Sequence, residues 1–510
     1  MRLSVIVLLI VCALGRADEL AERIREITHA PDYKQARWGI LVVDAKSARI
    51  VYEDNPDKLF LPASVTKLYT CATALDEFGP DFQFATPVYR RGEVKERVLD
   101  GDLILVASGD LTFGGRRGKT SAIEFTDSDH TYANSGLMNA KLTDTDPLYA
   151  LNDLARQVAK SIGEVKGEIM IDDRLFPRTR SSGSGPEIVC PLLVNDNVID
   201  VIITPAEKEG APATVKMRPE TAYIQMDADM RTVGEKSPPT ITLEVTGATH
   251  FLVRGQVPAK SGPYVRIVPV DEPILWARAL FIDALRKAGV KVTTSLHRPR
   301  RFDLPARDAT NLTKIAEYRS EPLSDVLKVT LKVSHNLYAS TLPVLTGLRN
   351  GSGAPDAGLR RQAKLLKGFG IDPLTVSFAG GAGGAQADSV TPRATVSLLQ
   401  SMSKHPAASD YFDALPILGV DGTLADSVGK DSPARGKARA KTGTLAWIDV
   451  QNDRVLLRSK ALAGDLETRT GTNLYFAMFL NDMPLPSGAS AADQGKALGK
   501  ICEVIHKHGP

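Results

Sequence analysis

The first residues that could do chemistry are a serine and a lysine three positions apart, in the stretch LPASVTKLYT at residues 61–70. From Ser64 onward, apolar residues recur at spacings of three and four, which predicts a helix with a buried face. Residues three apart are neighbours on a helix, so Ser64 and Lys67 can meet. A serine hydroxyl is a good nucleophile only when a base takes its proton. Lys67 can be that base only if its surroundings lower its pKa from about 10.4. A helix-capping serine followed by a solvated lysine would give the same pattern.

Two further motifs extend this pattern along the chain. Ser334-His335-Asn336 follows Ser64 after about 270 residues, and Lys441-Thr442-Gly443-Thr444 opens a predicted strand. Each motif is common by itself, as a helix cap or a solvated lysine. Their order is characteristic of penicillin-binding proteins and class A β-lactamases: Ser-x-x-Lys on a helix, then Ser-x-Asn, then Lys-Thr-Gly on a strand.

The chain resembles the class C low-molecular-mass penicillin-binding proteins, the D-alanyl-D-alanine carboxypeptidase/endopeptidase family. Besides the three motifs, the stretches WGILVVDAKSARIVYEDN, LVASGDLT, GVDGTL and RAKTGTL are similar to that family. The long separation between Ser64 and Ser334 matches a large insertion found in the family, whereas these serines lie close together in β-lactamases. The resemblance covers nearly the whole mature chain and is weakest across the insertion.

The resemblance implies an α/β (α+β) fold with a split, transpeptidase-like penicillin-binding domain, in which helices flank a central antiparallel sheet. We expect this catalytic domain to comprise residues 18–85 and 318–510. The insertion is expected to form an α/β accessory domain, residues 86–200 and 268–317, and a small accessory domain, residues 201–267. In the latter, apolar and polar residues alternate between prolines and glycines, which indicates a β-rich module.

The resemblance also implies roles for the residues of an acyl-transfer site. Ser64 would be the nucleophile and Lys67 its base. We expect Lys441, a second cation nearby, to lower the pKa of Lys67. Ser334 would relay a proton to the leaving amine, and Asn336 would orient Lys67 and the substrate amide.

Substrate binding is implied for the Lys-Thr-Gly strand. The backbone N–H groups of Ser64 and Thr444 would form the oxyanion hole. Lys441, Thr442 and Thr444, with Gly443 between them, would hold the terminal carboxylate of the substrate.

Three features depart from the family pattern or exceed it. His335 stands where the family often has an acidic or amide residue, and we expect its side chain to point away from the site. The family often has a stretch like DGSGLS, where this chain has AGGAGGA, with Gly380 and Ala382 at the Asp and Ser positions. That change affects the expected substrate contacts or loop geometry. The polar, irregular segment 112–146 is longer than the family needs.

A long helix with one apolar face is predicted around residues 323–347.

The N-terminus has the pattern of a cleaved secretory signal peptide, residues 1–17: a basic Arg2, an apolar run of about a dozen residues, and then Gly15-Arg16-Ala17, with Ala17 as the last residue removed. The run is too short to span a bilayer. Lipidation at Cys12 and an uncleaved anchor are the alternatives. Export leaves three scattered cysteines, which do not indicate a disulfide framework: Cys71, Cys190 and Cys502.

Composition excludes several other classes of function. The 510 residues are enough for two to four domains. With 63 basic and 60 acidic residues, the net charge is only +3, and no long basic tract indicates nucleic-acid binding. The eight histidines are scattered and lack metal-ligand spacing, so we expect no metal. No organic cofactor is implied.

We therefore expect a serine-type D-alanyl-D-alanine carboxypeptidase, a cell-wall hydrolase that cleaves peptidoglycan stem peptides through an acyl-enzyme at Ser64. Endopeptidase activity is left open. β-Lactam antibiotics are the expected covalent inhibitors, and the expected location is the periplasm or the cell envelope, with peripheral association. The alternatives are a β-lactamase or D-amino-acid amidase or esterase with the same Ser/Lys site, and a non-catalytic muropeptide-binding envelope protein. The sequence shows no G-x-S-x-G elbow of a Ser-His-Asp hydrolase.

Overall fold

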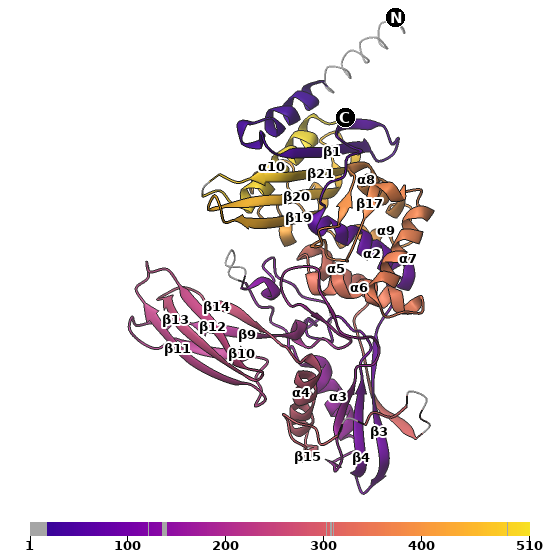
Figure 1. The fold of residues 1–510 in the computed structure, drawn as a ribbon, viewed down its shortest axis with the longest axis vertical. Coiled ribbons are helices and arrows are strands. Elements are labelled where there is room, and N and C mark those ends of the chain that lie inside the picture. Colours follow the sequence, from indigo (N-terminus) through magenta and orange to yellow (C-terminus); the bar gives the residue numbers. More distant parts are fainter. Residues whose placement is uncertain are drawn as a thin grey trace, which may run out of the picture. The chain divides into compact units, whose positions relative to one another are not determined.

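The computed structural model describes residues 18–120, 122–134, 140–301, 303–306, 309, 311–486 and 488–510 (Figure 1). The expected signal peptide, residues 1–17, lies outside the described residues. The chain divides into two compact units. The first comprises Met1–Asp81 and Leu323–Pro510, and the second comprises Phe82–Pro322.

The first unit is built on a five-stranded antiparallel sheet in the order β19-β20-β21-β1-β2 (Figure 1). Its strands are β1 (Arg37–Asp44), β2 (Ile50–Asp54), β19 (Ala438–Asp449), β20 (Arg454–Glu467) and β21 (Asn473–Pro484). Successive strand residues point to opposite faces of a sheet. Trp38 and Ile40 of β1 join one hydrophobic cluster with Ile501 of α10 (Ala491–His508). Helix α10 therefore covers one face, together with the helical residues 18–28.

The remaining helices of the first unit surround a buried central helix, α2 (Thr66–Phe78). Residues 66–75 of α2 are all buried, as expected for a helix with neighbours on every side. Helix α8 (Pro392–Met402) packs on the sheet, and the hydroxyls of Tyr69 and Thr395 join it to α2 at 2.9 Å. The others are α5 (Leu323–Lys332), α6 (Asn336–Arg349), α7 (Pro355–Gly368) and α9 (Ala408–Asp413), with a short strand pair, β17 (Val376–Ser377) and β18 (Ser389–Val390).

The long helix predicted over residues 323–347 is wrong in one respect, because the structure breaks it into α5 and α6. Ser334 adopts a left-handed backbone conformation, with φ of +64°, which a helix cannot include. His335 then caps α6, its ring nitrogen Nδ1 accepting the backbone N–H of Tyr338 at 3.3 Å. The apolar periodicity runs through both helices and therefore does not reveal the break.

The second unit contains a mixed sheet in the order β15-β5-β4-β3-β16, with β6 also paired to β4. Its strands are β3 (Ala85–Lys95), β4 (Val98–Val106), β5 (Glu164–Val165), β6 (Ile169–Asp172), β15 (Lys291–Val292) and β16 (Leu312–Arg319). Helices α3 (Tyr149–Ala159) and α4 (Pro273–Lys287) supply apolar residues such as Leu154 and Trp276 to the core beside this sheet.

Two three-stranded sheets follow within the second unit, β10-β9-β14 and β11-β13-β12. The strands are β9 (Val198–Thr204), β10 (Thr214–Arg218), β11 (Gln225–Val233), β12 (Thr240–Gly247), β13 (His250–Pro258) and β14 (Tyr264–Pro269). Val201 and Phe251 share one hydrophobic cluster with Trp276 of α4. The separate β-rich domain at residues 201–267 stays a prediction. The short remaining elements are β7 (Thr179–Arg180), β8 (Ile188–Val189), η1 (Pro31–Tyr33), η2 (Ala63–Val65), η3 (His130–Tyr132), η4 (Asn195–Asn197), η5 (Pro373–Thr375) and η6 (Gly422–Leu424).

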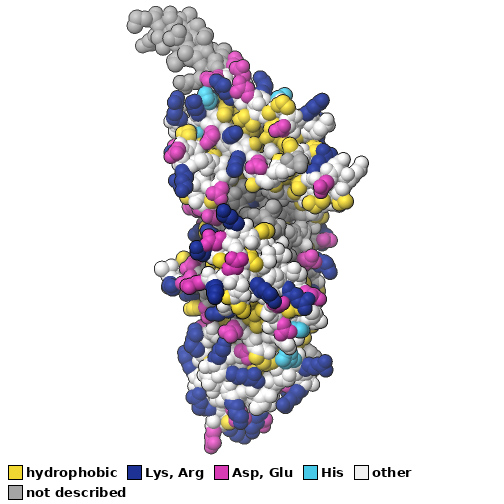
Figure 2. Space-filling view, turned by 90° about the vertical axis from the view of Figure 1, so that its left-hand side faces the viewer, with side chains coloured by type: hydrophobic (Ala, Val, Ile, Leu, Met, Phe, Trp, Pro, Cys, Tyr) yellow, Lys and Arg dark blue, Asp and Glu magenta, His cyan; other side chains and the backbone are white. Residues whose placement is uncertain are grey.

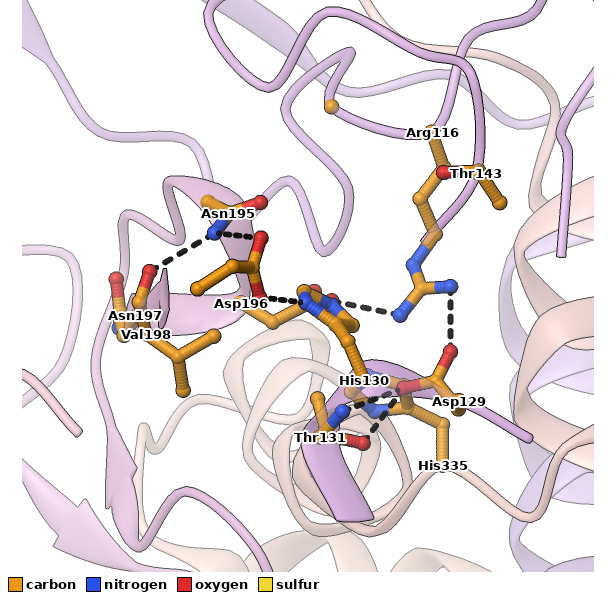
Figure 3. Close-up of polar contacts among 12 residues, drawn as sticks. Arg116, Asp129, His130, Thr131, Thr143, Asn195, Asp196, Asn197, Val198 and His335 are labelled. Carbon is orange, nitrogen blue, oxygen red and sulfur yellow. Dashed lines mark hydrogen bonds and ion pairs between the residues drawn. The ribbon is translucent and has the colours of Figure 1, made fainter. Parts of the chain in front are cut away.

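The irregular segment after β4 is held in the second unit by buried charges (Figure 3). The guanidinium of Arg116 donates to the carboxylates of Asp129 and Asp196, at 2.7 Å each. The imidazole of His130 lies 2.8 Å from Asp196 and 2.6 Å from Asp200. Burial alone would lower the pKa of His130, but the Asp200 charge and hydrogen bonds to both carboxylates raise it to about 10. The segment thus has a structural anchor that the sequence did not indicate.

The surface is mixed in charge. Figure 2 shows basic and acidic side chains interspersed over the face in view, in keeping with a net charge of only +3. Within the described part of the chain, every helix is too short or too polar to cross a membrane.

Candidate active site

The turn that carries Ser64 is held against the sheet. The backbone N–H of Leu61 donates to the buried side-chain oxygen of Asn481 in β21 at 2.7 Å. The carbonyl of Leu61 accepts the hydroxyl of Ser459 in β20 at 2.6 Å. Ser64 follows in the 3-10 turn η2, directly before α2. This position is the positive end of the helix dipole, which favours a developing anion.

Lys67, one turn further, is completely buried and makes three hydrogen bonds. Its Nζ lies 2.8 Å from Ser64 Oγ, 2.7 Å from Asn336 Oδ1 and 2.8 Å from the carbonyl oxygen of Ala382. Three segments distant in sequence therefore meet at one amine: the start of α2, the start of α6 and the glycine-rich loop.

Burial is the main cause that lowers the pKa of Lys67, to about 7, against the opposing effects of Cys71 and Asp388. The sequence had predicted that the charge of Lys441 lowers the pKa of Lys67. That explanation is wrong, because burial is the main cause. Burial also lowers the pKa of Lys441, and there the repulsion of the two ammonium groups adds to it. The pKa of Lys67 is lowered, as expected from the sequence, and desolvation is the principal cause.

The Ser334-His335-Asn336 motif forms the connection between α5 and α6. Asn336 is the first residue of α6 and points its side-chain oxygen at Lys67. His335 is fully buried and stacks on the ring of Tyr338 with the centroids 3.7 Å apart. Its capping contact and this stacking support the turn in which the half-buried Ser334 lies.

The Lys-Thr-Gly strand β19 runs close to the turn of Ser64. A Cβ added at Gly443 would be 2.5 Å from the carbonyl oxygen of Pro62 and 3.2 Å from Cβ of Ala63. Only glycine permits this approach. The buried ammonium of Lys441 donates to the carbonyl of Thr442 at 2.8 Å.

Hydroxyl groups of the same strand have partners that the sequence analysis missed. Thr442 Oγ1 donates to Thr423 Oγ1 at 2.8 Å, and Thr423 belongs to the stretch GVDGTL that had signalled the family. Thr444 Oγ1 accepts from Lys460 Nζ at 2.9 Å. Lys460 is the residue opposite Thr444 in the β19–β20 register, a pairing that a hairpin prediction could have found.

The glycine-rich loop AGGAGGA presses its backbone against the helices. A Cβ at Gly381 would be 2.0 Å from the carbonyl oxygen of Ala339 in α6. At Gly383, where φ is +89°, it would be 1.9 Å from the carbonyl oxygen of Ala63. The Thr70 hydroxyl donates to the carbonyl of Gly381 at 2.8 Å. The altered loop is therefore closely packed on α2 and supplies a carbonyl to Lys67.

Among the residues that the structure describes, one cluster of metal-binding residue types lies in the second unit (Figure 3). Ligand atoms of Asp129, His130 and Asp196 all lie within 4.8 Å of one another. The guanidinium of Arg116 already binds both carboxylates. Since a cation occupies the position between them, we assign the cluster to the ion-pair network that anchors its segment.

These features together define a class of protein. Penicillin-binding serine acyl-transferases have a site of this kind. It combines a Ser-x-x-Lys pair at the start of a buried helix, an Asn from a neighbouring helix, and a Lys-Thr-Gly strand at the edge of an antiparallel sheet.

Comparison with known proteins narrows the class to a family. The model of the D-Ala-D-Ala carboxypeptidase 3 (S13) family matches residues 20–501, and the chain belongs to this family. A D-alanyl-D-alanine carboxypeptidase of Actinomadura sp. is 29% identical over 85% of this chain and 78% of its own. The D-alanyl-D-alanine carboxypeptidase DacB of Haemophilus influenzae is 23% identical, over 87% of this chain and 85% of its own.

The fold agrees with this assignment. The crystal structure of penicillin-binding protein 4 (dacB) from Haemophilus influenzae matches with a TM-score of 0.69 and 20% identity, over 95% of this chain and 99% of that one. The expected α/β fold class is confirmed, and so is the family. The protein is a serine-type D-alanyl-D-alanine carboxypeptidase.

Proposed function

We propose that Ser64 attacks the terminal D-Ala-D-Ala bond of peptidoglycan stem peptides and that Lys67 takes its proton. The three hydrogen bonds of Lys67 carry this proposal. A neutral amine has two N–H bonds and one lone pair. The oxygens of Asn336 and Ala382 accept the two N–H bonds, so the lone pair is left facing the hydroxyl of Ser64. With a pKa of about 7, a large fraction of Lys67 is neutral near neutral pH.

Groups of the site supply and accept every proton of the acylation step. Ser64 Oγ bonds to the carbonyl carbon while its proton passes to Lys67, and the backbone N–H groups of Ser64 and Thr444 hold the oxyanion. The C–N bond then breaks, and the amine of the terminal D-Ala leaves with a proton relayed through Ser334. Water subsequently hydrolyses the acyl-enzyme and regenerates the hydroxyl of Ser64.

The substrate carboxylate is the group that we assign to Lys441, Thr442 and Thr444. A carboxylate is best held by cations and hydroxyl donors. The hydrogen bond from Lys460 to Thr444 adds a second cation beside this part of strand β19. Gly443 lets these groups approach the turn of Ser64.

Exposure of the purified mature protein to benzylpenicillin, followed by intact-mass measurement, tests the proposal, with Ser64→Ala beside it. We expect a β-lactam to acylate Ser64 as the substrate does, and we place the enzyme in the periplasm or at the cell envelope. One stable penicillin adduct, lost in Ser64→Ala, is the expected result. An adduct that survives in Ser64→Ala would overturn the proposal. Hydrolysed penicillin without an adduct would indicate a β-lactamase instead.

Release of D-alanine from a stem pentapeptide measures the activity on substrate. A cross-linked muropeptide dimer, assayed in parallel, measures endopeptidase activity. Both are expected to disappear in Ser64→Ala. A non-catalytic muropeptide-binding protein would release no D-alanine in either form.

A further inference from the structure

The buried carboxylate of Asp388 joins the two ends of the glycine-rich loop, residues 379–385. Asp388 directly precedes β18, and its side chain is only 1% exposed. Its Oδ1 accepts the backbone N–H of Ala379 at 2.9 Å, and its Oδ2 accepts that of Ala385 at 3.1 Å. The backbone N–H of Asp388 donates in turn to the carbonyl of Ala385 at 3.1 Å. One side chain thus joins the two ends of the loop.

The chain on either side of this loop also contacts the segment that leads to Ser64 and helix α2. The backbones of Val390 and Phe60 exchange two hydrogen bonds, each 2.9 Å long. Phe378, next to β17, packs its ring on that of Tyr69 in α2, with centroids 4.8 Å apart. The loop is therefore fixed relative to α2 at its base, and Asp388 fixes its two ends to each other.

We propose that Asp388 is a positioning residue of the acylation reaction, which holds the loop so that the carbonyl of Ala382 stays against Nζ of Lys67. The inference rests on the proposed function. If Ala382 moves away, one N–H of the neutral amine loses its acceptor, and the lone pair is no longer confined to the direction of Ser64. Asp388 does not touch substrate in this scheme; it acts on Lys67 through the loop and through its charge.

The carboxylate of Asp388 also acts on Lys67 through its charge. The ionisable groups that face Lys67 are Cys71 of α2, Lys441 of β19 and Asp388 of the loop. The negative charge of Asp388 raises the pKa of Lys67 against the lowering effect of burial. Burial raises the pKa of Asp388 itself to about 6, so most of the carboxylate is ionised at about pH 7, the midpoint of the Lys67 titration.

The variant Asp388→Asn tests the proposal, because it removes the charge and one of the two acceptors while keeping the size. The rate of acylation by benzylpenicillin is measured from pH 5 to pH 9. We expect the maximal rate to fall about tenfold to a hundredfold. We also expect the rising limb of the profile to move to lower pH, because Lys67 loses the charge that favours its protonated form. A carboxylate with a merely structural role would lower the thermal midpoint but leave the folded protein with the parent's maximal acylation rate and the parent's limb.

Two further variants separate the possibilities. Asp44→Asn is the matched control, since Asp44 accepts the backbone N–H groups of Lys46 and Ser47 in the β1–β2 turn, without contact to Lys67. This variant is expected to keep the parent's maximal acylation rate and the pH at which that rate rises. Asp388→Glu keeps the charge but changes its reach, so the rate is expected to fall with the limb unmoved, which also provides the test if Asp388→Asn does not fold.

The outcomes distinguish this inference from the proposed function. Parent-like rates and limbs in both folded Asp388 variants, with acylation abolished in Ser64→Ala, would overturn the role of Asp388 alone. Acylation that survives in Ser64→Ala would overturn the site itself.

Discussion

The amine of Lys67 and the side-chain oxygen of Asn336 lie 2.7 Å apart, although 269 positions separate them in the chain. The distance is short enough for a charge-assisted hydrogen bond. Because α6 begins at Asn336, the break after α5 places this oxygen at the amine. The break at Ser334 is therefore part of the construction of the site.

Asn336→Ala should slow acylation by benzylpenicillin about a hundredfold, because Lys67 loses one of the two acceptors that orient its lone pair. The second-order rate constant of adduct formation measures this loss. Asn350→Ala is the control, since Asn350 caps the other end of α6 and donates to the carbonyl of Thr346 at 2.9 Å. Its rate should stay within about twofold of the parent. Equal rates in the parent and in Asn336→Ala would contradict the assigned orientation.

The pH dependence of acylation follows from the pKa of Lys67. Burial lowers this pKa from 10.5 to about 7, and only the neutral amine accepts a proton. The acylation rate should therefore rise with pH through about 7 and then level off. A rate that is constant from pH 5 to pH 9 would show that Lys67 is not the base. Lys67→Arg should show no rising limb at any of these values, because a guanidinium stays protonated.

The same pKa has a consequence for folding, with a definite sign. The unfolded Lys67 binds a proton up to its ordinary pKa, whereas the folded one loses it near pH 7. Between these values the unfolded state binds more protons, so the contribution of Lys67 to the free energy of unfolding rises with pH. Below about pH 7 the buried charge is a constant cost to stability. The Lys67→Met variant should lack this component of the pH dependence in thermal unfolding.

Local patterns predicted the parts of the site that depend on a few neighbouring residues. The spacing of Ser64 and Lys67 follows from the helical period, and strand β19 follows from the residues around Lys441. The structure brings Lys67 and Asn336 together, as the motif order had suggested. The family and the α/β class were likewise predicted from the motifs.

The rest depends on tertiary packing, which no local pattern contains. The Ala382 contact is made by a backbone carbonyl, and any residue carries one. The reason for the low pKa of Lys67 is complete burial, which only the assembled helices and sheet produce. The left-handed conformation of Ser334 breaks a helix whose apolar pattern is continuous. These features required the three-dimensional structure.

Gly443→Ala should damage the site through the backbone of β19. The added Cβ would meet the carbonyl oxygen of Pro62 at 2.5 Å and Cβ of Ala461 at 3.2 Å. Strand β19 must then move from the turn of Ser64, at a cost of about 1–3 kcal/mol in the free energy of unfolding. We expect acylation to slow at least tenfold, because the N–H of Thr444, which we propose as an oxyanion donor, moves with the strand.

The control for that variant is Gly368→Ala, at the end of α7, where a Cβ would have no heavy atom within 4 Å. Alanine is the better helix former, so this variant should be neutral or slightly stabilising. Thermal unfolding and penicillin acylation are measured on both. Parent-like acylation in Gly443→Ala would mean that β19 does not need its close approach to the Ser64 turn.

Arg116→Met should destabilise the second unit strongly. Arg116 is 5% exposed and neutralises Asp129 and Asp196, which are themselves buried. Removing one member of a buried ionic network costs about 3–5 kcal/mol, because the remaining charges stay out of water. Arg156→Met is the matched control, since Arg156 and Asp153 form an exposed pair at 3.3 Å whose expected contribution is below about 1 kcal/mol. Thermal unfolding of the full chain compares the two variants. Equal losses would show that the network does not anchor the segment after β4, whereas a much larger loss in Arg116→Met would support its role as the anchor.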